Sequence, residues 1–307
     1  MSKTVLVATE KPFAKAAVDG IKNQLDKVGY KLELLEKYTE KQEFLDAVKS
    51  VDALIIRSDN VTKEVIDAAD NLKIVVRGGA GYDNVDCAAA TAKNVVVMNT
   101  PGQNSNAVAE LAFGMMLNLA RQKYSGKAGT ELKGKIVGIH AYGNVGKAVA
   151  RIAKGFMMTV KAFDPFVSSD VMEADGVVSV ATIDELYSSC DYISLHIPAN
   201  ESTVKSINYA VLSEMKKGAA LINTARKEVI DEAGLIEMFE KREDFLYGSD
   251  LTPDCKDELI KRFENRVFIT AKKMGAQTAE ANINAGIAAA RQIVNFFEKN
   301  DTTYKVN

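Results

Sequence analysis

Short apolar runs rich in β-branched residues alternate with segments of helical periodicity along almost the whole chain. Several of these runs are apolar on both faces, as buried parallel strands require. Between them, segments such as 104–122 and 145–155 carry apolar residues at the three- and four-residue spacing of amphipathic helices. This alternation predicts βαβ units with right-handed crossovers, and hence an α/β fold of doubly wound sheets. We predict strands at residues 4–8, 31–35, 53–57, 73–77, 95–99, 135–139, 159–163, 192–196, 220–224, 246–250 and 266–270.

The predicted strands are too many for one ordinary open sheet, so we predict two α/β domains. The boundary is expected after the fifth strand, near the sequence TPGQN at 100–104, where proline and glycine interrupt the pattern before a long helix. A last helical segment covers 277–299. Periodicity alone leaves open which of the two domains this closing helix joins.

Composition places the chain among ordinary globular proteins. Its 307 residues leave room for two domains, and 47% apolar with 26% charged residues exclude a disordered, collagen-like or low-complexity protein. The formal net charge is −2, so no basic surplus indicates a nucleic-acid or membrane partner. No stretch approaches 18 uncharged apolar residues, so no membrane span is predicted.

Cysteine and histidine are too few and too scattered for a metal site or a disulfide framework. Cys87, Cys190 and Cys255 lie far apart without a CxxC motif, and the two histidines are His140 and His196. We therefore expect no metal and no disulfide scaffold, and we predict a reducing, cytosolic compartment. The apolar run in the N-terminal sequence MSKTVLVATEKP is too short for a signal sequence.

The segment 134–152 is predicted to form a strand, a tight turn and a helix, and its core AYGNVG is a GxGxxG dinucleotide fingerprint with alanine in the first slot. Small residues are needed there because the turn is sharp, the backbone approaches a pyrophosphate, and the helix packs closely on its strand. The free N–H groups at the start of the helix attract phosphate, so we assign Gly143, Asn144, Val145 and Gly146 to the cofactor. Ala141 is compatible with this turn if its φ stays below zero.

Asp164 is the second part of the predicted nucleotide site. It ends the following strand, 18 residues after Gly146. A carboxylate at this position accepts hydrogen bonds from the adenosine ribose hydroxyls and repels a 2′-phosphate, so it selects NAD over NADP.

Five segments extend the pattern well beyond the nucleotide turn. They read RSDNVTKEVIDAADNLKIVVRGGAGYDNVD (57–86), VVVMNTPGQNSNAVAELAFGMMLNLAR (95–121), GTELKGKIVGI (129–139), ISLHIPAN (193–200) and MKKGAALINTARKEVIDEAGLIE (215–237). In this order, and over nearly the whole chain, they resemble the D-2-hydroxyacid dehydrogenase family, and within it the D-3-phosphoglycerate dehydrogenases most.

The resemblance implies two Rossmann-like domains: a split substrate domain at 1–99 and 277–307, and a central NAD-binding domain at 100–276. The closing helix is then expected to return to the first domain. The resemblance also implies a homodimer formed through 100–130, and a short form of the enzyme without C-terminal regulatory domains.

The family transfers a hydride from a 2-hydroxy acid to NAD+ with an arginine, a histidine and a glutamate. The arginine carries over to Arg226 of the NTAR segment, whose planar fork suits a substrate carboxylate and the neighbouring oxygen. The histidine is absent. Alignment on Gly275 and Ala276 gives Lys273 in its place, which we prefer, whereas alignment on Thr270 gives Lys272.

The glutamate is also displaced. It normally follows a strand-ending aspartate by five residues, and here that aspartate is Asp250 and the fifth residue is Cys255. Asp254 is the nearest carboxylate, so we predict that it orients the base and tunes its pKa. Neither His140 nor His196 is a convincing substitute, because each lies beside the expected cofactor site.

The resemblance assigns further contacts to both ligands. Cofactor contacts are expected at Pro198, Thr224, Ala225 and Asp250. Substrate contacts are expected at Arg57, Ser58, Arg77, Gly79 and Asn104. Two arginines beyond Arg226 suit a substrate that carries a phosphate as well as a carboxylate.

These observations predict an NAD-dependent oxidation of D-3-phosphoglycerate to 3-phosphohydroxypyruvate, the first step of serine biosynthesis, with a lysine as acid/base. One alternative is a dehydrogenase or reductase of an unphosphorylated 2-hydroxy acid, such as a hydroxypyruvate or glyoxylate reductase. An alternative of another class is a non-catalytic NAD-binding sensor or corepressor, which the lost histidine favours and Arg226 disfavours.

Overall fold

The computed structural model describes residues 2–307 and divides the chain into two units. Unit 1 comprises Met1–Asn104 and Thr278–Asn307, and unit 2 comprises Ser105–Gln277. The first boundary lies five residues later than predicted. Thr100 N–H donates to the Gly79 carbonyl (2.9 Å), so the turn after the fifth strand stays in unit 1, and the chain leaves it where the next helix begins.

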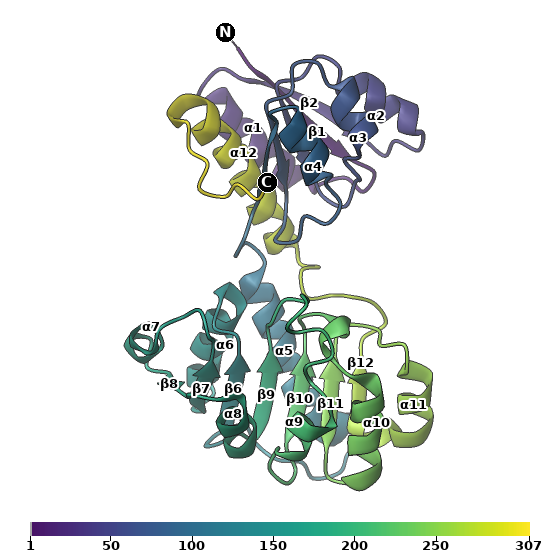
Figure 1. Ribbon diagram of the computed structural model, residues 1–307, viewed down its shortest axis with the longest axis vertical. Helices are drawn as coiled ribbons and strands as arrows, with labels where there is room; N and C mark the ends of the chain where they lie inside the picture. The colour runs from purple at the N-terminus through teal and green to yellow at the C-terminus, as the bar shows by residue number, and fades with distance from the viewer. Residues whose placement is uncertain (1) are drawn as a thin grey trace. The chain divides into compact units, whose positions relative to one another are not determined.

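Unit 1 is a parallel sheet with strand order β2-β1-β3-β4-β5 and helices on both faces (Figure 1). This order reverses between β1 and β3, as in doubly wound folds. Its elements are β1 (Thr4–Thr9), α1 (Lys15–Asp26), β2 (Lys31–Glu36), α2 (Lys41–Ala47), β3 (Ala53–Ile56), α3 (Lys63–Ala68), β4 (Ile74–Arg77), α4 (Cys87–Ala92), β5 (Val96–Asn99) and α12 (Ala279–Lys299).

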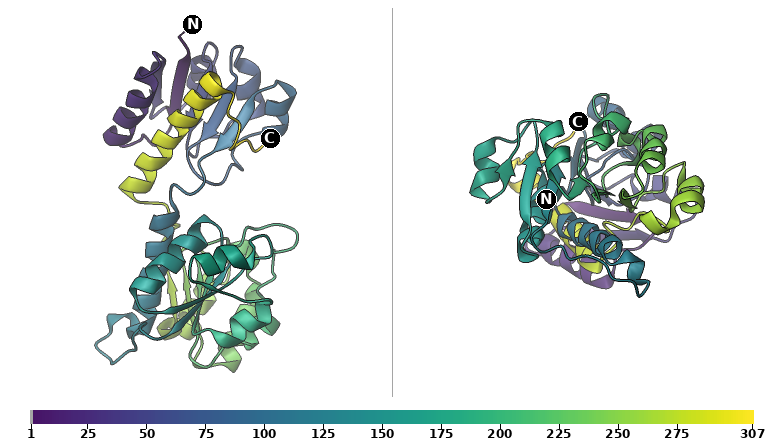
Figure 2. Two further views of the ribbon diagram at one scale, coloured as in Figure 1. Left: turned by 90° about the vertical axis from the view of Figure 1, so that its left-hand side faces the viewer. Right: turned by 90° about the horizontal axis from the view of Figure 1, so that it is seen from below.

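The closing helix α12 completes one face of this sheet, beside α1 (Figure 2). Ala289, Ala290 and Ile293 of α12 pack with α1 and with inward-facing strand residues such as Val5 and Val76. The opposite face packs against α2, α3 and α4 through a second apolar cluster. Every strand residue of β3 is buried, which explains why its sequence is apolar on both faces.

Unit 2 is a seven-stranded parallel sheet of order β12-β11-β10-β9-β6-β7-β8. Its strands are β6 (Ile136–His140), β7 (Thr159–Phe163), β8 (Val178–Ser179), β9 (Tyr192–Leu195), β10 (Ala220–Asn223), β11 (Leu246–Ser249) and β12 (Val267–Ile269). Its helices are α5 (Ser105–Ala120), α6 (Asn144–Gly155), α7 (Ser169–Ala174), α8 (Ile183–Ser189), α9 (Tyr209–Ser213), α10 (Glu232–Lys241) and α11 (Lys256–Phe263), with 3₁₀ turns at Gln122–Tyr124, Lys227–Val229 and Glu264–Arg266.

The strand order of unit 2 reverses between β6 and β9, which fixes where a ligand is expected. In such sheets the crevice lies beyond the carboxyl ends of the strands at this reversal. The α/β class and the eleven predicted strands are confirmed, and the short edge strand β8 is the one that we missed. Within residues 2–307, no helix combines the length and apolarity needed to cross a bilayer.

Candidate functional site

The turn between β6 and α6 has the geometry of a phosphate-binding loop. Gly143 caps the helix, and a Cβ built on it would meet no atom within 4 Å, so the backbone faces open space. A Cβ on Gly146 would lie 2.4 Å from the Ala141 carbonyl oxygen, so the helix approaches its strand too closely for any larger residue. Asn144 and Val145 begin the helix, where N–H groups lack intrahelical partners. The turn therefore fits a pyrophosphate.

Ala141 does not meet the condition set from the sequence. Its φ is +80°, in the left-handed region that glycine adopts without penalty. A non-glycine residue there costs about 1–2 kcal/mol. The first slot of the fingerprint therefore stores backbone strain at the nucleotide turn.

Asp164 lies where the ribose-binding carboxylate is expected. Its Oδ2 accepts the Tyr142 N–H (2.7 Å) and its Oδ1 accepts the Phe166 N–H (2.8 Å). These bonds hold the carboxylate at the end of β7, against the nucleotide turn. Each carboxylate oxygen has a second lone pair, so Asp164 keeps acceptor capacity for ribose hydroxyls.

The two histidines lie together at the reversal of the sheet. The backbone N–H of His196 donates to the backbone carbonyl of His140 (2.9 Å). The His196 ring bonds to the Ser194 hydroxyl (2.9 Å), and the His140 ring bonds to the Tyr187 hydroxyl (3.2 Å). Burial lowers the pKa of His140 to about 4 and that of His196 to about 3. Both imidazoles are therefore neutral at pH 7. That neither is the acid/base stays a prediction.

Two buried polar atoms after β10 and β11 have no hydrogen-bond partner among the described residues. They are Thr224 Oγ1 and Asp250 Oδ1. Thr224 is 7% exposed and Asp250 is 1% exposed. Burying a polar group without a partner costs free energy, so such atoms mark a place for a ligand. A carboxamide carries both a donor and an acceptor, so this pair fits the nicotinamide end of NAD.

The NTAR segment is fixed by a residue that our sequence analysis did not single out. Asn223 is fully buried, accepts the Ala225 N–H (3.0 Å) and donates to the Arg226 carbonyl (2.9 Å). The half-buried Arg226 also donates from Nη1 to the Ala225 carbonyl (2.9 Å). Asn223 thus sets the direction in which the arginine leaves β10. The signal was present, because asparagine opens the NTAR motif.

The candidate lysines lie on the exposed loop after β12. Lys272 and Lys273 are both exposed, and the Lys272 carbonyl accepts the Thr270 hydroxyl (2.7 Å). The loop is tied to β11, because Asp250 Oδ2 accepts the N–H groups of Gly275 (2.7 Å) and Met274 (3.2 Å). Burial raises the pKa of Asp250, and those two N–H groups and the charge of Lys273 act in the opposite direction.

Asp254 has a different partner from the one that we predicted. Its carboxylate forms an ion pair with Lys227 (2.7 Å), and its side chain is 82% exposed. Glu232 accepts the backbone N–H groups of Asp254 and Cys255, both at 2.8 Å, and so fixes this loop. The ion pair directs the carboxylate to Lys227, so the structure gives no support to Asp254 as the group that orients Lys273.

The remaining predicted cofactor contacts border the same edge of unit 2. Pro198 is exposed, and its carbonyl accepts the Thr203 hydroxyl (2.6 Å). Ala225 is 7% exposed and lies between Thr224 and Arg226. Within residues 2–307, His, Cys, Asp and Glu form no group of three or more that could hold a metal ion.

The predicted substrate residues of unit 1 lie at the carboxyl ends of β3 and β4. Arg77 donates from Nε to the Arg57 carbonyl (3.0 Å). Arg57 donates from Nη2 to Asn282 (2.6 Å), and burial lowers the pKa of this half-buried guanidinium. A Cβ on Gly79 would lie 1.5 Å from Arg77 Nη1, so glycine leaves room for that arginine.

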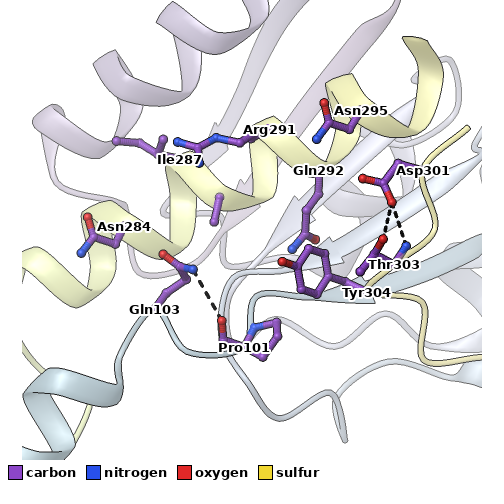
Figure 3. Close-up of a pocket in the computed structure, with 11 residues that line it drawn as sticks. Pro101, Gln103, Asn284, Ile287, Arg291, Gln292, Asn295, Asp301, Thr303 and Tyr304 are labelled. Carbon is purple, nitrogen blue, oxygen red and sulfur yellow. Dashed lines mark hydrogen bonds between the residues drawn. The ribbon is translucent and has the colours of Figure 1, made fainter. Parts of the chain in front are cut away.

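Ser58 and Asn104 complete the predicted substrate set. Ser58 is exposed beside Arg57, and Asn104 is the last residue of unit 1 before α5. A cavity of about 270 Å³ in unit 1 lies elsewhere, between α12, the 101–103 segment and residues 301–304 (Figure 3). No predicted substrate residue lines that cavity.

Comparison with known proteins gives one family and several relatives. Residues 109–271 match the family described as D-isomer specific 2-hydroxyacid dehydrogenase, NAD binding domain. The chain is 37% identical to a hydroxypyruvate reductase of Thermotoga maritima, over 85% of this chain and 90% of that protein. It is 35% identical to a D-3-phosphoglycerate dehydrogenase of Archaeoglobus fulgidus, over 95% of this chain and 56% of that protein.

Solved structures agree with these matches. An NAD+-bound 3-phosphoglycerate dehydrogenase of Entamoeba histolytica is 44% identical, covers 100% of this chain and 99% of its own, and has a TM-score of 0.87. The D-lactate dehydrogenase of Escherichia coli has a TM-score of 0.77 at 25% identity, over 99% of this chain and 100% of its own. The chain spans about half the length of several phosphoglycerate dehydrogenases that it matches.

Proposed function

Because this chain belongs to the D-isomer specific 2-hydroxyacid dehydrogenases, a family of NAD-dependent enzymes, we propose that it oxidises D-3-phosphoglycerate to 3-phosphohydroxypyruvate. The observation that carries the proposal is the group at the carboxyl edge of unit 2. There Asn223 fixes Arg226 beside the orphaned atoms of Thr224 and Asp250.

Bound NAD+ would supply the hydride acceptor for the carbon that bears the substrate hydroxyl. Gly143, Asn144, Val145 and Gly146 would hold its pyrophosphate, and Asp164 its ribose hydroxyls. Thr224 and Asp250 would orient its carboxamide.

Arg226 binds the substrate carboxylate and the oxygen that changes from hydroxyl to carbonyl. Its planar guanidinium cation stabilises negative charge on that oxygen as the hydroxyl becomes a carbonyl. Lys273 in its neutral form accepts the hydroxyl proton on Nζ and becomes an ammonium. In the reverse direction the ammonium returns that proton to the carbonyl oxygen.

Arg57 and Arg77 support a phosphorylated substrate. Arg57 directly follows β3 and Arg77 is the last residue of the neighbouring parallel strand β4, where it pairs with Ile56 in the sheet register. Ser58 and the backbone around Gly79 would add hydrogen bonds to an anion, and Asn104 would contact the substrate from the end of unit 1. A homodimer and a cytosolic location stay predictions.

A second candidate is the reduction of unphosphorylated hydroxypyruvate. The observation that favours it is the 37% identity to a hydroxypyruvate reductase over 85% of this chain. The non-catalytic alternative rests on the absent histidine and the displaced glutamate.

A substrate panel separates the three. We expect NADH formation from D-3-phosphoglycerate at pH 9 to exceed that from D-glycerate, D-lactate and glycolate at equal concentrations. Faster NADH consumption with hydroxypyruvate than with 3-phosphohydroxypyruvate at pH 7 would favour the second candidate. NADH binding without turnover on any compound would favour the sensor.

The variant Arg77→Ala tests the phosphate contact. We expect KM for 3-phosphoglycerate to rise about 10- to 150-fold, because a charge-assisted hydrogen bond contributes about 1.5–3 kcal/mol. KM for D-glycerate should change little. Lys63→Ala, which removes an exposed charge at the start of α3 in the same unit, is the matched control. Equal losses on both substrates would argue against a phosphate contact.

A further inference from the structure

A buried carboxylate lies at the carboxyl edge of the sheet in unit 1. It belongs to Asp59, which is 4% exposed. Its Oδ1 accepts the Glu10 N–H (2.7 Å) and the Tyr38 hydroxyl (2.9 Å), and its Oδ2 accepts the Arg57 N–H (3.3 Å). Burial and the nearby Asp59 carboxylate raise the pKa of Tyr38, so that hydroxyl stays protonated and donates. A buried carboxylate is stable only with such donors, so these contacts define its position.

The three donors come from loops that leave three neighbouring strands. Glu10 directly follows β1, Tyr38 lies two residues after β2, and Arg57 directly follows β3. These strands are adjacent and parallel, in the order β2-β1-β3. The Asp59 carboxylate therefore joins three loops at the edge where the substrate residues of unit 1 are predicted.

Asp59 holds the segment that the Arg57 guanidinium contacts as well as the Arg57 backbone. The guanidinium donates from Nη1 to two carbonyls of the segment 11–13 (both 3.4 Å), and its Cζ lies 5.1 Å from the centroid of the Phe13 ring. Glu10, whose N–H binds Asp59, directly precedes that segment. One carboxylate thus fixes both the start of the arginine side chain and the segment on which that side chain lies.

Asn84 fixes the same loop from its carbonyl side. Its Nδ2 donates to the carbonyls of Asp59 (2.7 Å) and Arg57 (3.2 Å), and Arg77 Nε donates to the Arg57 carbonyl (3.0 Å). Arg57 is therefore held by its N–H, its carbonyl and its guanidinium. Burial lowers the pKa of that guanidinium, and the Asp59 charge acts in the opposite direction and favours the cation.

We propose that Asp59 is a positioning residue for the substrate: its carboxylate holds Arg57 in the orientation that binds the substrate phosphate. The proposal rests on the proposed function, because it assumes that Arg57 contacts that phosphate. Asp59 acts through the arginine and not by contact with the substrate.

The variant Asp59→Asn tests the proposal, because the amide keeps the size of the side chain but replaces one acceptor oxygen with a donor. We expect KM for D-3-phosphoglycerate to rise about 10- to 100-fold, since a misplacement of about 1 Å can cost about 100-fold. The rise should not exceed that in Arg57→Ala. Both kcat and KM for NAD+ should stay near their wild-type values, because the residues proposed for hydride transfer and NAD+ binding lie in unit 2.

Asp52→Asn is the matched control at the amino edge of the same sheet. The Asp52 carboxylate accepts the Thr4 N–H (2.8 Å) and bonds to the Lys3 ammonium (3.1 Å). Its replacement should lower the free energy of unfolding, measured with urea, and leave KM for D-3-phosphoglycerate unchanged. A similar rise in KM in both variants would count against the proposal, because loss of stability in unit 1 would then be enough to weaken binding.

A second measurement separates positioning from general damage to the fold. In an Arg57→Ala background, Asp59→Asn should change KM less than about twofold, because a residue that acts through the Arg57 side chain has no further effect once that side chain is gone. A purely structural role would raise KM by the same factor in both backgrounds.

Tyr38→Phe is the milder variant, for use if Asp59→Asn does not fold. It removes one of the donors to the carboxylate and leaves the ring in place. We expect a smaller rise in KM, which should likewise disappear in the Arg57→Ala background.

Two results would overturn the proposal: a wild-type KM in Asp59→Asn and Tyr38→Phe while Arg57→Ala raises KM, or an equal rise with and without the Arg57 side chain. Failure of the proposed function looks different. In that case Arg57→Ala itself leaves KM for D-3-phosphoglycerate unchanged, and the positioning role falls with it.

Discussion

The two edges of the sheet in unit 2 differ in how completely their polar groups are paired. At the carboxyl edge, Thr224 Oγ1 and Asp250 Oδ1 are buried without partners among the described residues. At the amino edge, charged side chains saturate one another and the neighbouring backbone.

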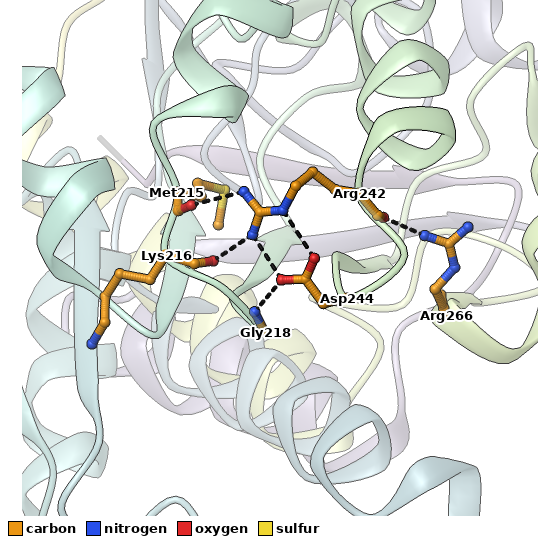
Figure 4. A network of polar contacts seen from close by, with 6 residues as sticks. All are labelled: Met215, Lys216, Gly218, Arg242, Asp244 and Arg266. Carbon is orange, nitrogen blue, oxygen red and sulfur yellow. Dashed lines mark hydrogen bonds and ion pairs between the residues drawn. The ribbon is translucent and has the colours of Figure 1, made fainter.

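The amino edge is organised by Arg242 (Figure 4). Its guanidinium donates to both oxygens of Asp244 (2.9 and 2.7 Å) and to the carbonyls of Met215 (3.1 Å) and Lys216 (2.9 Å). Arg266 in turn donates to the Arg242 carbonyl (2.5 Å). The guanidinium holds the pKa of the Asp244 carboxyl well below its usual range.

The difference teaches where this fold tolerates unfavourable local structure. Two unpaired buried polar atoms lie where the cofactor is expected, while paired charges secure the opposite edge. Substitutions at the carboxyl edge should therefore change catalysis more than stability, and substitutions at the amino edge the reverse.

The largest expected effect is at the carboxyl edge. Lys273→Ala should lower the oxidation rate constant by about 10²- to 10⁴-fold, because a positioned base contributes that much. NAD affinity, measured by fluorescence titration, should stay nearly unchanged, since the side chain is exposed.

Lys272→Ala is the matched control and should do much less. If Lys272→Ala loses the rate and Lys273→Ala keeps it, the alignment is wrong by one residue. If both keep it, the base lies elsewhere, and His196 becomes the first residue to test.

At the amino edge, Arg242→Gln should lower the free energy of unfolding by about 2–3 kcal/mol, because two part-buried carbonyls and a carboxylate lose a charged donor. Urea unfolding measures this, and kcat should remain at the wild-type value. Arg262→Gln is the control, since its guanidinium bonds to the exposed Glu240 and Glu258, and loss of such exposed ion pairs should change the stability much less. Equal costs for the two variants would contradict the contrast between the edges.

The third effect depends on pH. A buried histidine whose pKa falls from about 6.5 to about 4 stays neutral in the folded state, while the unfolded chain binds a proton. Stability is then lost as pH falls from 6.5 toward 4. Between pH 7 and pH 5 we expect the free energy of unfolding of His140→Gln to fall by about 2 kcal/mol less than that of wild type. Urea unfolding at both pH values measures this difference. Equal losses of stability in wild type and His140→Gln would show that His140 is already protonated in the folded state at pH 5.

The smallest predicted effect is a gain in stability. Ala141→Gly should raise the free energy of unfolding by about 0.5–1 kcal/mol, because glycine adopts a φ of +80° without strain. Ala150→Gly, inside α6, is the control and should cost about 1 kcal/mol. Relative to wild type, we expect the melting temperature to rise in Ala141→Gly and to fall in Ala150→Gly. A lower melting temperature in both variants would remove the argument for strain at the nucleotide turn.

The sequence was sufficient for most of the fold because buried parallel strands need apolar residues on both faces. That requirement is visible in runs such as ALII of β3. We did not predict strand β8, because its two residues, Val178 and Ser179, are too few to show a periodic pattern. The family and NAD as its cofactor followed from motifs, and both predictions are confirmed.

Site details depended on contacts that local sequence does not encode. The pairing of Asp254 with Lys227 joins loops 27 residues apart, and Glu232 fixes the same loop from a third position. The φ of Ala141 follows from the turn and not from alanine's own preference. Lys273 as acid/base stays a prediction.

The discontinuous make-up of unit 1 has a consequence for synthesis on the ribosome. Its first 104 residues are separated from α12 by the 173 residues of Ser105–Gln277, which take about 10–35 s to translate. During that time the sheet face that later contacts Ala289, Ala290 and Ile293 has no helix α12 to cover it. Unit 2, which is continuous, can fold first, so the nascent chain passes through a stage in which the later half of the structure is complete and the earlier half awaits its last helix.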